Sequence, residues 1–187
     1  MRYFLDTEFC EDGHTIDLIS IGIVAQDGRE FYACNLDADL RRCHDRDSWL
    51  RENVLAPLPG YGDKAWMRRA AIRDAAALFM GYARATLSDP HPAIPVPDDK
   101  PEIWAYVGAS DWVAFYQLWG RLMDMPRRFP RWCRELKQLA ELVGNPPLLP
   151  RGEGAHNALE DARWNRAVYD QLITLVPAGA SKGEARR

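Results

Sequence analysis

The chain has 187 residues, of which 47% are hydrophobic and 27% are charged, and its net charge is −3. This size and composition are typical of one globular domain with a sizeable core, and the slightly acidic balance excludes a molecule that is basic over its whole surface. The sequence has no apolar run of the roughly 20 residues that a membrane span needs and no signal-peptide pattern before its first expected strand, so we expect a cytoplasmic protein.

The first 36 residues predict three strands joined by short turns. Residues 2–9 (RYFLDTEF) alternate as a strand does, and residues 15–26 (TIDLISIGIVAQ) are apolar and β-branched. An Asp-Gly hairpin signal then leads into a third strand at 29–36 (REFYACNL). Strands joined in this way form an antiparallel meander, in which we expect the first strand to be central.

The rest of the sequence predicts further strands, several helices and one proline-rich loop. A buried strand is expected at 102–109 (EIWAYVGA) and a short fifth strand near 146–150. Five prolines predict an extended loop over 88–101. The helices are expected at 47–55, at 63–87, from residue 110 onward, at 130–144 and at 156–176.

This order of elements predicts an α/β fold with a mixed five-stranded sheet, part antiparallel meander and part parallel strands, flanked by helices. We expect one domain over 1–176 and a disordered polar tail over 177–187. The four cysteines are widely spaced and form no CxxC pair, which favours unligated thiols over a zinc site.

Two carboxylates interrupt the apolar first strand. Asp6 and Glu8 are two residues apart, so they project from the same face of the strand, where their charges repel each other. A divalent cation between them would remove this repulsion, and the pair therefore indicates a metal site. The simpler alternative is an edge strand with a solvated acidic face.

Three further residues could complete such a site. Asp111 follows the strand 102–109, at the kind of strand end where ligand sites collect in α/β folds, although it also fits a helix N-cap. With Asn157 as the N-cap of the last helix, His156 would lie just outside that helix and Asp161 in its first turns. A histidine in this position suits a general base, and a solvated surface is the simpler alternative.

The order of these motifs resembles the DEDDh group of 3′–5′ exonucleases, which have a ribonuclease H-like fold. The residues that carry the resemblance are D-x-E in the first strand, an aspartate at a mid-chain strand end, and H-x-x-x-x-D in HNALEDAR. The DTEF opening and this ending are most similar to ribonuclease T-like exoribonucleases of the mycobacterial type. The second motif, YVGASD, lacks the asparagine that many of these enzymes carry before the aspartate, and Asp124 is the other mid-chain candidate.

The resemblance implies a metal-dependent 3′–5′ exoribonuclease that releases nucleoside 5′-monophosphates one at a time from single-stranded RNA or 3′ overhangs. Two divalent ions, Mg²⁺ or Mn²⁺, would act in this hydrolysis. By the same resemblance, Asp6 would bridge both ions, and Glu8 and Asp161 would complete the site of the ion that activates water. Asp111 would serve the second ion, and His156 would deprotonate the attacking water.

Substrate contacts and partners are also implied. The candidate substrate residues, for which core packing is the alternative, are Phe9, Leu18, Ile19, Trp112 and Tyr116. A basic stretch could form a rim for phosphates; it contains Arg121, Arg127, Arg128, Arg131, Arg134 and Lys137 against Asp124 and Glu135. A lesser cluster contains Arg68, Arg69 and Arg73.

Alternatives with the same fold stay open. One is an exonuclease for very short oligonucleotides or DNA 3′ ends, and another is an inactive nuclease-fold module that binds nucleic acid. The presence of residues at all five chemical positions argues against the inactive module. The resemblance further implies a homodimer as one oligomeric state.

Overall fold

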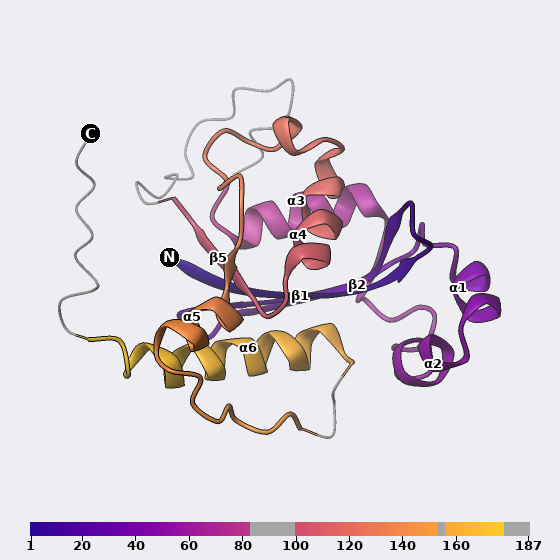
Figure 1. Cartoon of the computed structure of the whole chain (residues 1–187). Helices are drawn as coiled ribbons and strands as arrows, with labels where there is room; N and C mark the ends of the chain where they lie inside the picture. Colours follow the sequence, from indigo (N-terminus) through magenta and orange to yellow (C-terminus); the bar gives the residue numbers. More distant parts are fainter. Residues whose placement is uncertain (83–99, 153–155, 178–187) are drawn as a thin grey trace.

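A computed structural model of the chain describes residues 1–82, 100–152 and 156–177 (Figure 1). In these residues six strands form one mixed sheet in the order β4-β3-β2-β1-β5-β6. The strands are β1 (Arg2–Glu11), β2 (Ile16–Ala25), β3 (Glu30–Asn35), β4 (Trp66–Met67), β5 (Glu102–Ala105) and β6 (Arg134–Glu135). β1, β2 and β3 pair in antiparallel fashion, while β4, β5 and β6 join in parallel.

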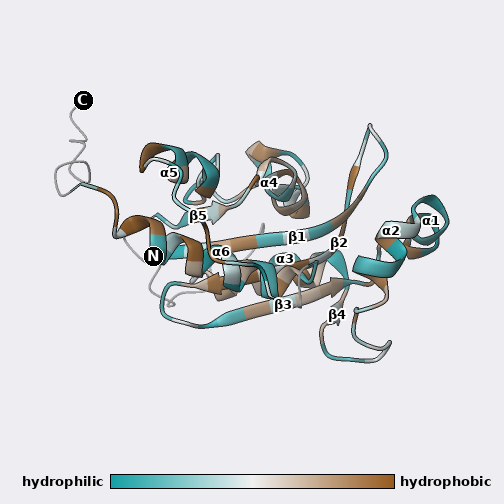
Figure 2. Cartoon of the chain, turned by 60° about the horizontal axis from the view of Figure 1, so that its bottom comes forward, coloured by the Kyte–Doolittle hydropathy of each residue, from teal (hydrophilic) through white to brown (hydrophobic). Residues whose placement is uncertain are grey.

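Helices cover both faces of the sheet. The α-helices in the described residues are α1 (Leu40–Arg46), α2 (Ser48–Leu50), α3 (Arg69–Phe79), α4 (Ala109–Tyr116), α5 (Leu136–Leu142) and α6 (Ala158–Ile173). α3 and α4 lie on one face, α5 and α6 lie on the other, and α1 and α2 form a small group at the far end of the long β1–β2 pair (Figure 1). In Figure 2, α3, α4 and α6 each carry brown and teal segments, as expected of helices with one apolar side.

The alternation of β1 divides the core between the two faces. Tyr3 contacts Phe79 of α3 with ring centroids 6.0 Å apart, while the next residue, Phe4, contacts Tyr169 of α6 at 5.3 Å. This alternation follows from the two-residue period of a strand. Because both faces are apolar here, β1 is buried in the middle of the sheet.

The predicted meander and the central position of the first strand are confirmed, but the number of strands was wrong. The sheet has six strands rather than five, and the described residues 146–150 form no strand. The additional parallel strands, β4 and β6, lie within segments predicted as helices. Each is two residues long and leads into a helix, so the helical periodicity that follows hides it in the sequence.

The helix predicted at 47–55 is present as α2 followed by a π-helical turn over Arg51–Leu55. The helix predicted over 63–87 begins only at Arg69, and its part beyond residue 82 lies outside the described residues. Most of the predicted proline-rich loop and nearly all of the predicted tail also lie outside them. In the parts of the chain that the structure describes, no helix has the length and apolar character needed to cross a membrane.

Candidate active site

A glycine in β2 brings the start of α6 against the sheet. Gly22 is the register partner of Asp6, and a Cβ atom added to it would lie 2.1 Å from the carbonyl oxygen of Ala158, the first residue of α6. The side-chain amide of Asn165 donates to the carbonyl oxygen of Leu5 at 2.9 Å, which ties the same helix to β1. The N-terminal turns of α6 therefore lie directly beside the acidic pair of β1.

The start of α6 places a histidine and an aspartate near Glu8. Asn157 is the N-cap, as predicted, and the preceding His156 has a left-handed backbone with φ of 70°. The backbone N–H of His156 donates to Oδ2 of Asp161 at 2.8 Å. The side chains of Glu8, His156 and Asp161 each offer a ligand atom, and these atoms lie within 4.8 Å of one another.

Asp111 reaches the same place from the other side of the sheet. β5 pairs with β1 only as far as Phe4, so the edge of β1 beyond that point is not covered by a strand. Asp111 Oδ1 accepts hydrogen bonds there from the Thr7 backbone N–H at 2.8 Å and from the Thr7 hydroxyl at 2.7 Å. The turn before α4 is fixed by Glu135, which accepts from the N–H of Gly108 at 2.9 Å.

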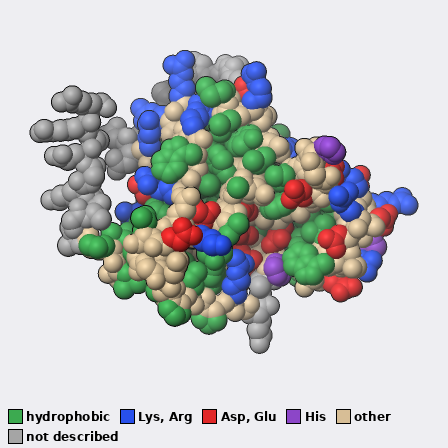
Figure 3. Space-filling view, in the orientation of Figure 1, with side chains coloured by type: hydrophobic (Ala, Val, Ile, Leu, Met, Phe, Trp, Pro, Cys, Tyr) green, Lys and Arg blue, Asp and Glu red, His purple; other side chains and the backbone are tan. Residues whose placement is uncertain are grey.

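Burial and neighbouring charges raise the pKa of three carboxyl groups at this place. Burial, followed by the charges of Asp111, Asp161 and Glu8, raises the pKa of Asp6 well above its usual range. Burial and then the charges of Asp161 and Asp111 raise the pKa of Glu8 to about 8. Burial raises the pKa of Asp111 to about 6, although the hydrogen bonds from Thr7 act in the opposite direction. We call Asp6, Glu8, Asp111 and Asp161 the carboxylate cluster; in Figure 3 acidic side chains gather between α4 and the start of α6, with a histidine at their edge.

Arg151 is the positive group that opposes these shifts. It forms an ion pair with Asp161, and its charge offsets a small part of the rise in the pKa of Asp6 and of Glu8. Its guanidinium lies 4.5 Å from the ring centroid of Trp164, in the range of a cation–π contact. Reasoning from the sequence missed Arg151 because no spacing rule connects it to the acidic motifs.

Trp49 was also missed. This residue of α2 packs edge-on against the ring of His156, with centroids 4.7 Å apart, although it is more than 100 residues away in the sequence. Its side chain is 49% exposed. A lone tryptophan in a polar segment gave no signal that it would meet the histidine.

The other predicted contacts fall in different places. Leu18 and Ile19 are fully buried in the core, and Trp112 is buried against Phe115. Phe9 and Tyr116 are half-buried, so a role in binding substrate stays a prediction for these two. Burial of the other three favours the packing alternative.

Asp124, the other mid-chain candidate, forms an ion pair with Arg121 at 2.8 Å and is not among the groups that act on Asp6. Asp111 is therefore the mid-chain aspartate that the fold joins to the carboxylate cluster.

The lesser basic cluster is largely engaged within the chain. Arg68 pairs with Asp37 at 3.0 Å, and Arg73 pairs with Asp74 at 2.8 Å.

The family model described as 3′–5′ exoribonuclease Rv2179c-like domain matches residues 1–173. The chain belongs to the Rv2179c-like family. Two proteins of Mycobacterium tuberculosis, named 3′–5′ exoribonuclease Rv2179c (strain ATCC 25618 / H37Rv) and 3′–5′ exoribonuclease MT2234.1 (strain CDC 1551 / Oshkosh), are each 45% identical to it over 186 residues. In both cases the match covers 100% of this chain and 100% of the relative.

A solved structure supports the fold of this Rv2179c-like chain. The Mg²⁺- and Mn²⁺-bound form of Pop2p from S. pombe superposes with a TM-score of 0.53 at 10% identity, covering 99% of this chain and 86% of that one. At this identity the likeness concerns the fold alone, which is ribonuclease H-like. The predicted fold class and the predicted resemblance to exoribonucleases of the mycobacterial type are thus confirmed.

Proposed function

We propose that this protein is a 3′–5′ exoribonuclease that removes nucleoside 5′-monophosphates from the 3′ end of RNA by metal-dependent hydrolysis. The observation that carries the proposal is the convergence of the carboxylate cluster with His156 at one end of β1. The membership of the Rv2179c-like family supports the reaction class and the substrate.

The donor set of the cluster fits divalent ions. It consists of carboxylate oxygens, the ligands that Mg²⁺ and Mn²⁺ prefer. Burial raises the pKa values of Asp6, Glu8 and Asp111, so a nearby cation would stabilise their ionised form. Asp6, Glu8 and Asp161 would hold one ion, and Asp6 and Asp111 would hold a second. When bound, the two ions would polarise the scissile phosphate and lower the pKa of a water molecule.

The residues of the chain have separate tasks in this reaction. His156 accepts a proton from the attacking water at a ring nitrogen. The hydrogen bonds from Thr7 orient Asp111, and the backbone N–H of His156 orients Asp161. The water oxygen attacks the phosphorus of the last phosphodiester and the bond from phosphorus to O3′ breaks. The O3′ oxygen takes up a proton from solvent, so the shortened RNA ends in a 3′-hydroxyl and the last nucleotide leaves as a 5′-monophosphate.

The test is an incubation of the purified protein with Mg²⁺ and RNA labelled in its terminal 3′ nucleotide. We expect a labelled 5′-mononucleotide from the wild type and almost none from Asp6→Ala. Asp124→Asn is the matched control, because it changes the other mid-chain aspartate, and it should retain activity. A wild type that releases no mononucleotide, or an Asp6→Ala variant with normal activity, would refute the proposal.

Parallel reactions with single-stranded DNA, dinucleotides and duplexes with 3′ overhangs separate the substrate classes. We expect RNA with a single-stranded 3′ end to be degraded fastest. Faster release of mononucleotides from DNA would instead support an exonuclease for DNA 3′ ends. Release from dinucleotides alone would support an exonuclease for very short oligonucleotides.

A further inference from the structure

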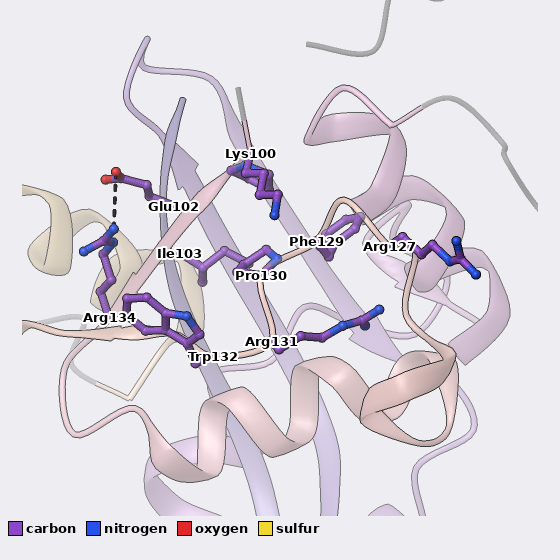
Figure 4. A pocket seen from close by; sticks show the side chains of 10 residues that line it. Lys100, Glu102, Ile103, Arg127, Phe129, Pro130, Arg131, Trp132 and Arg134 are labelled. Carbon is purple, nitrogen blue, oxygen red and sulfur yellow. Dashed lines mark ion pairs between the residues drawn. The ribbon is translucent and has the colours of Figure 1, made fainter. Parts of the chain in front are cut away.

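A second charged site lies where β5 begins. A cavity of about 370 Å³ opens between the start of β5 and the segment 127–134, and it is lined by four cations, Lys100, Arg127, Arg131 and Arg134, against one carboxylate, Glu102. Figure 4 shows Lys100, Arg127 and Arg131 on one side of the opening and the ion pair of Arg134 with Glu102 on the other. We call this site, together with Trp132, the basic pocket.

One wall of the basic pocket is an aromatic surface. The side chain of Trp132 is 56% exposed, and the guanidinium of Arg134 lies 4.9 Å from its ring centroid. The same guanidinium lies 5.5 Å from the ring of Trp104 and pairs with Glu102 at 3.5 Å. Arg134 thus contacts the Trp132 ring, and the exposed part of that ring is available to stack on a planar group.

The segment around the pocket is held in place by its own contacts. Arg131 donates hydrogen bonds to the carbonyl oxygens of Leu122 at 2.8 Å and of Met125 at 3.2 Å. Among the described residues, neither Lys100 nor Arg127 forms an ion pair, and both are exposed. These two cations are therefore available to an anionic ligand at a wall that is already formed.

A local excess of cations beside an open aromatic ring fits a single-stranded nucleic acid. Its phosphates take up the positive charge, and any base can stack on the ring, so recognition is independent of sequence. The pocket stands out because the chain as a whole carries a net charge of −3.

The position of the pocket relates it to the carboxylate cluster. β1 and β5 pair at Tyr3 and Ile103, and Ile103 lines the pocket. Asp6 and Glu8 lie three and five residues beyond Tyr3 on β1, so the rise along this strand from Tyr3 is about 10 Å to Asp6 and about 16 Å to Glu8, at about 3.3 Å per residue. Lys and Arg side chains gather at the upper left of the face that carries the acidic cluster (Figure 3). An RNA whose 3′ end lies at the carboxylate cluster therefore needs only a few more nucleotides to reach the basic pocket.

We propose that the basic pocket binds the RNA strand a few nucleotides to the 5′ side of the scissile bond. A base stacks on Trp132, and the adjoining phosphates contact Lys100 and Arg127. This inference rests on the proposed function, because it needs the 3′ end of the strand to lie at the carboxylate cluster.

The test measures binding without cleavage, in the presence of a chelator, by fluorescence polarisation of labelled RNA. One RNA is a dinucleotide and the other is about ten nucleotides long, within the span that single-strand sites cover. For the longer RNA we expect Trp132→Ala to lower affinity about tenfold, since stacking on one base is worth about 1–3 kcal/mol, and Trp132→Phe to restore most of it. The affinity for the dinucleotide should not change.

The double variant Lys100→Ala/Arg127→Ala should also weaken binding of the longer RNA. The slope of log affinity against log salt should fall by about 1.4, since each phosphate contact on a single strand contributes about 0.7. The matched control is Arg41→Ala/Lys64→Ala, which removes the same charge from exposed positions outside the pocket and should leave the slope unchanged.

Three results would overturn the pocket proposal. The first is that both pocket variants keep the wild-type affinity and salt slope. The second is an equal loss of affinity for the dinucleotide and the longer RNA, and the third is tight binding of a free mononucleotide with no preference for longer RNA. Because binding is measured without cleavage, these results are separate from the release of mononucleotide that tests the proposed function.

Discussion

Like charges gather at two places in this protein, and the chain stabilises them differently. In the carboxylate cluster, burial and then the neighbouring acids raise the pKa of Asp6 and Glu8, and Arg151 is a cation that opposes this rise. In the basic pocket, Arg134 already rests on two tryptophan rings and on Glu102. The carboxylate cluster therefore needs cations from solution to be stable in its ionised form, whereas the basic pocket needs no added ions to keep its charged form.

The largest difference between the carboxylate cluster and the basic pocket should come from neutralising one carboxylate of the cluster. Asp6→Asn removes an ionisable group that the proposed reaction needs, so we expect mononucleotide release to fall by a factor of about 10³ or more. The same change removes repulsion, so the metal-free variant should melt at least about 2 °C above the wild type at about pH 8. Activity and thermal unfolding measure the two effects.

Lys100→Ala/Arg127→Ala is the counterpart in the basic pocket. We expect its melting temperature and its turnover of a dinucleotide to stay near the wild-type values.

A lower melting temperature for metal-free Asp6→Asn than for the metal-free wild type would mean that Asp6 stabilises the metal-free fold, contrary to the electrostatic argument.

The next effect concerns the backbone that positions the cluster. Gly22→Ala would force a Cβ atom against the carbonyl of Ala158, so α6 must move away from β2 together with His156 and Asp161. Overpacking of this kind costs about 1–3 kcal/mol of unfolding free energy. We also expect a marked loss of activity in the fraction that folds, measured by denaturant unfolding and by RNA turnover.

Gly60→Ala is the control, because a Cβ atom there has no neighbour within 4 Å. It should change neither stability nor activity. Equal behaviour of the two variants would show that α6 can shift without disturbing the site.

Gly22 also illustrates what the sequence could reveal. A glycine inside an apolar strand is a sign of close approach by another element, but the sequence does not say which element approaches. The acidic motifs could be assembled from their order and the resemblance, because strand ends and helix starts confine Asp111 and Asp161. Arg151 and Trp49 could not, since their contacts depend on how distant segments pack.

The short strands of the fold likewise depend on how distant segments pack. β1, β2 and β3 are long enough for their alternation to show, and the meander was predicted correctly. β4 and β6 have two residues each and exist only because a neighbouring edge is available, at Cys34 and Trp104. A pattern of two residues carries no period, so such strands appear only in the folded chain.

The stability of the metal-free protein should depend on pH with a definite sign. The pKa of Glu8 is raised to about 8, so the folded state holds a proton that the unfolded state has lost above its ordinary carboxyl range. The free energy of unfolding should therefore fall as pH rises from about 5 to about 8. Thermal unfolding in a chelator measures this trend.

Mg²⁺ or Mn²⁺ should reverse the trend, because the ions bind the deprotonated carboxylates and stabilise the folded state. The rise in melting temperature on adding the ion should be larger at about pH 8 than at about pH 5. Glu8→Gln should flatten the metal-free profile. A profile that rises with pH in the metal-free wild type would contradict the cluster's electrostatics.

A smaller effect is expected at Arg151, the cation that the cluster already has. Its guanidinium pairs with Asp161, so a divalent ion must displace it to use that carboxylate. Arg151→Gln should therefore bind Mn²⁺ a few-fold more tightly at about pH 9, where protons compete least. Calorimetric titration measures the affinity, and Arg163→Gln is the control because Arg163 pairs with Glu30 instead. Weaker binding by Arg151→Gln would mean that the arginine holds Asp161 in place for the ion.

The smallest effect should come from Trp49, which contacts the proposed base rather than the metal ligands. Without the indole, the His156 ring loses the neighbour that restricts its rotation. Since general-base catalysis contributes about 10²–10⁴-fold, partial misorientation should lower kcat several-fold in Trp49→Ala while Mn²⁺ affinity stays at the wild-type value. Trp49→Phe keeps an aromatic edge against the ring and should recover most of kcat. A fall in metal affinity together with kcat would instead place the effect of Trp49 on the cluster itself, through a shift of the whole segment that carries His156.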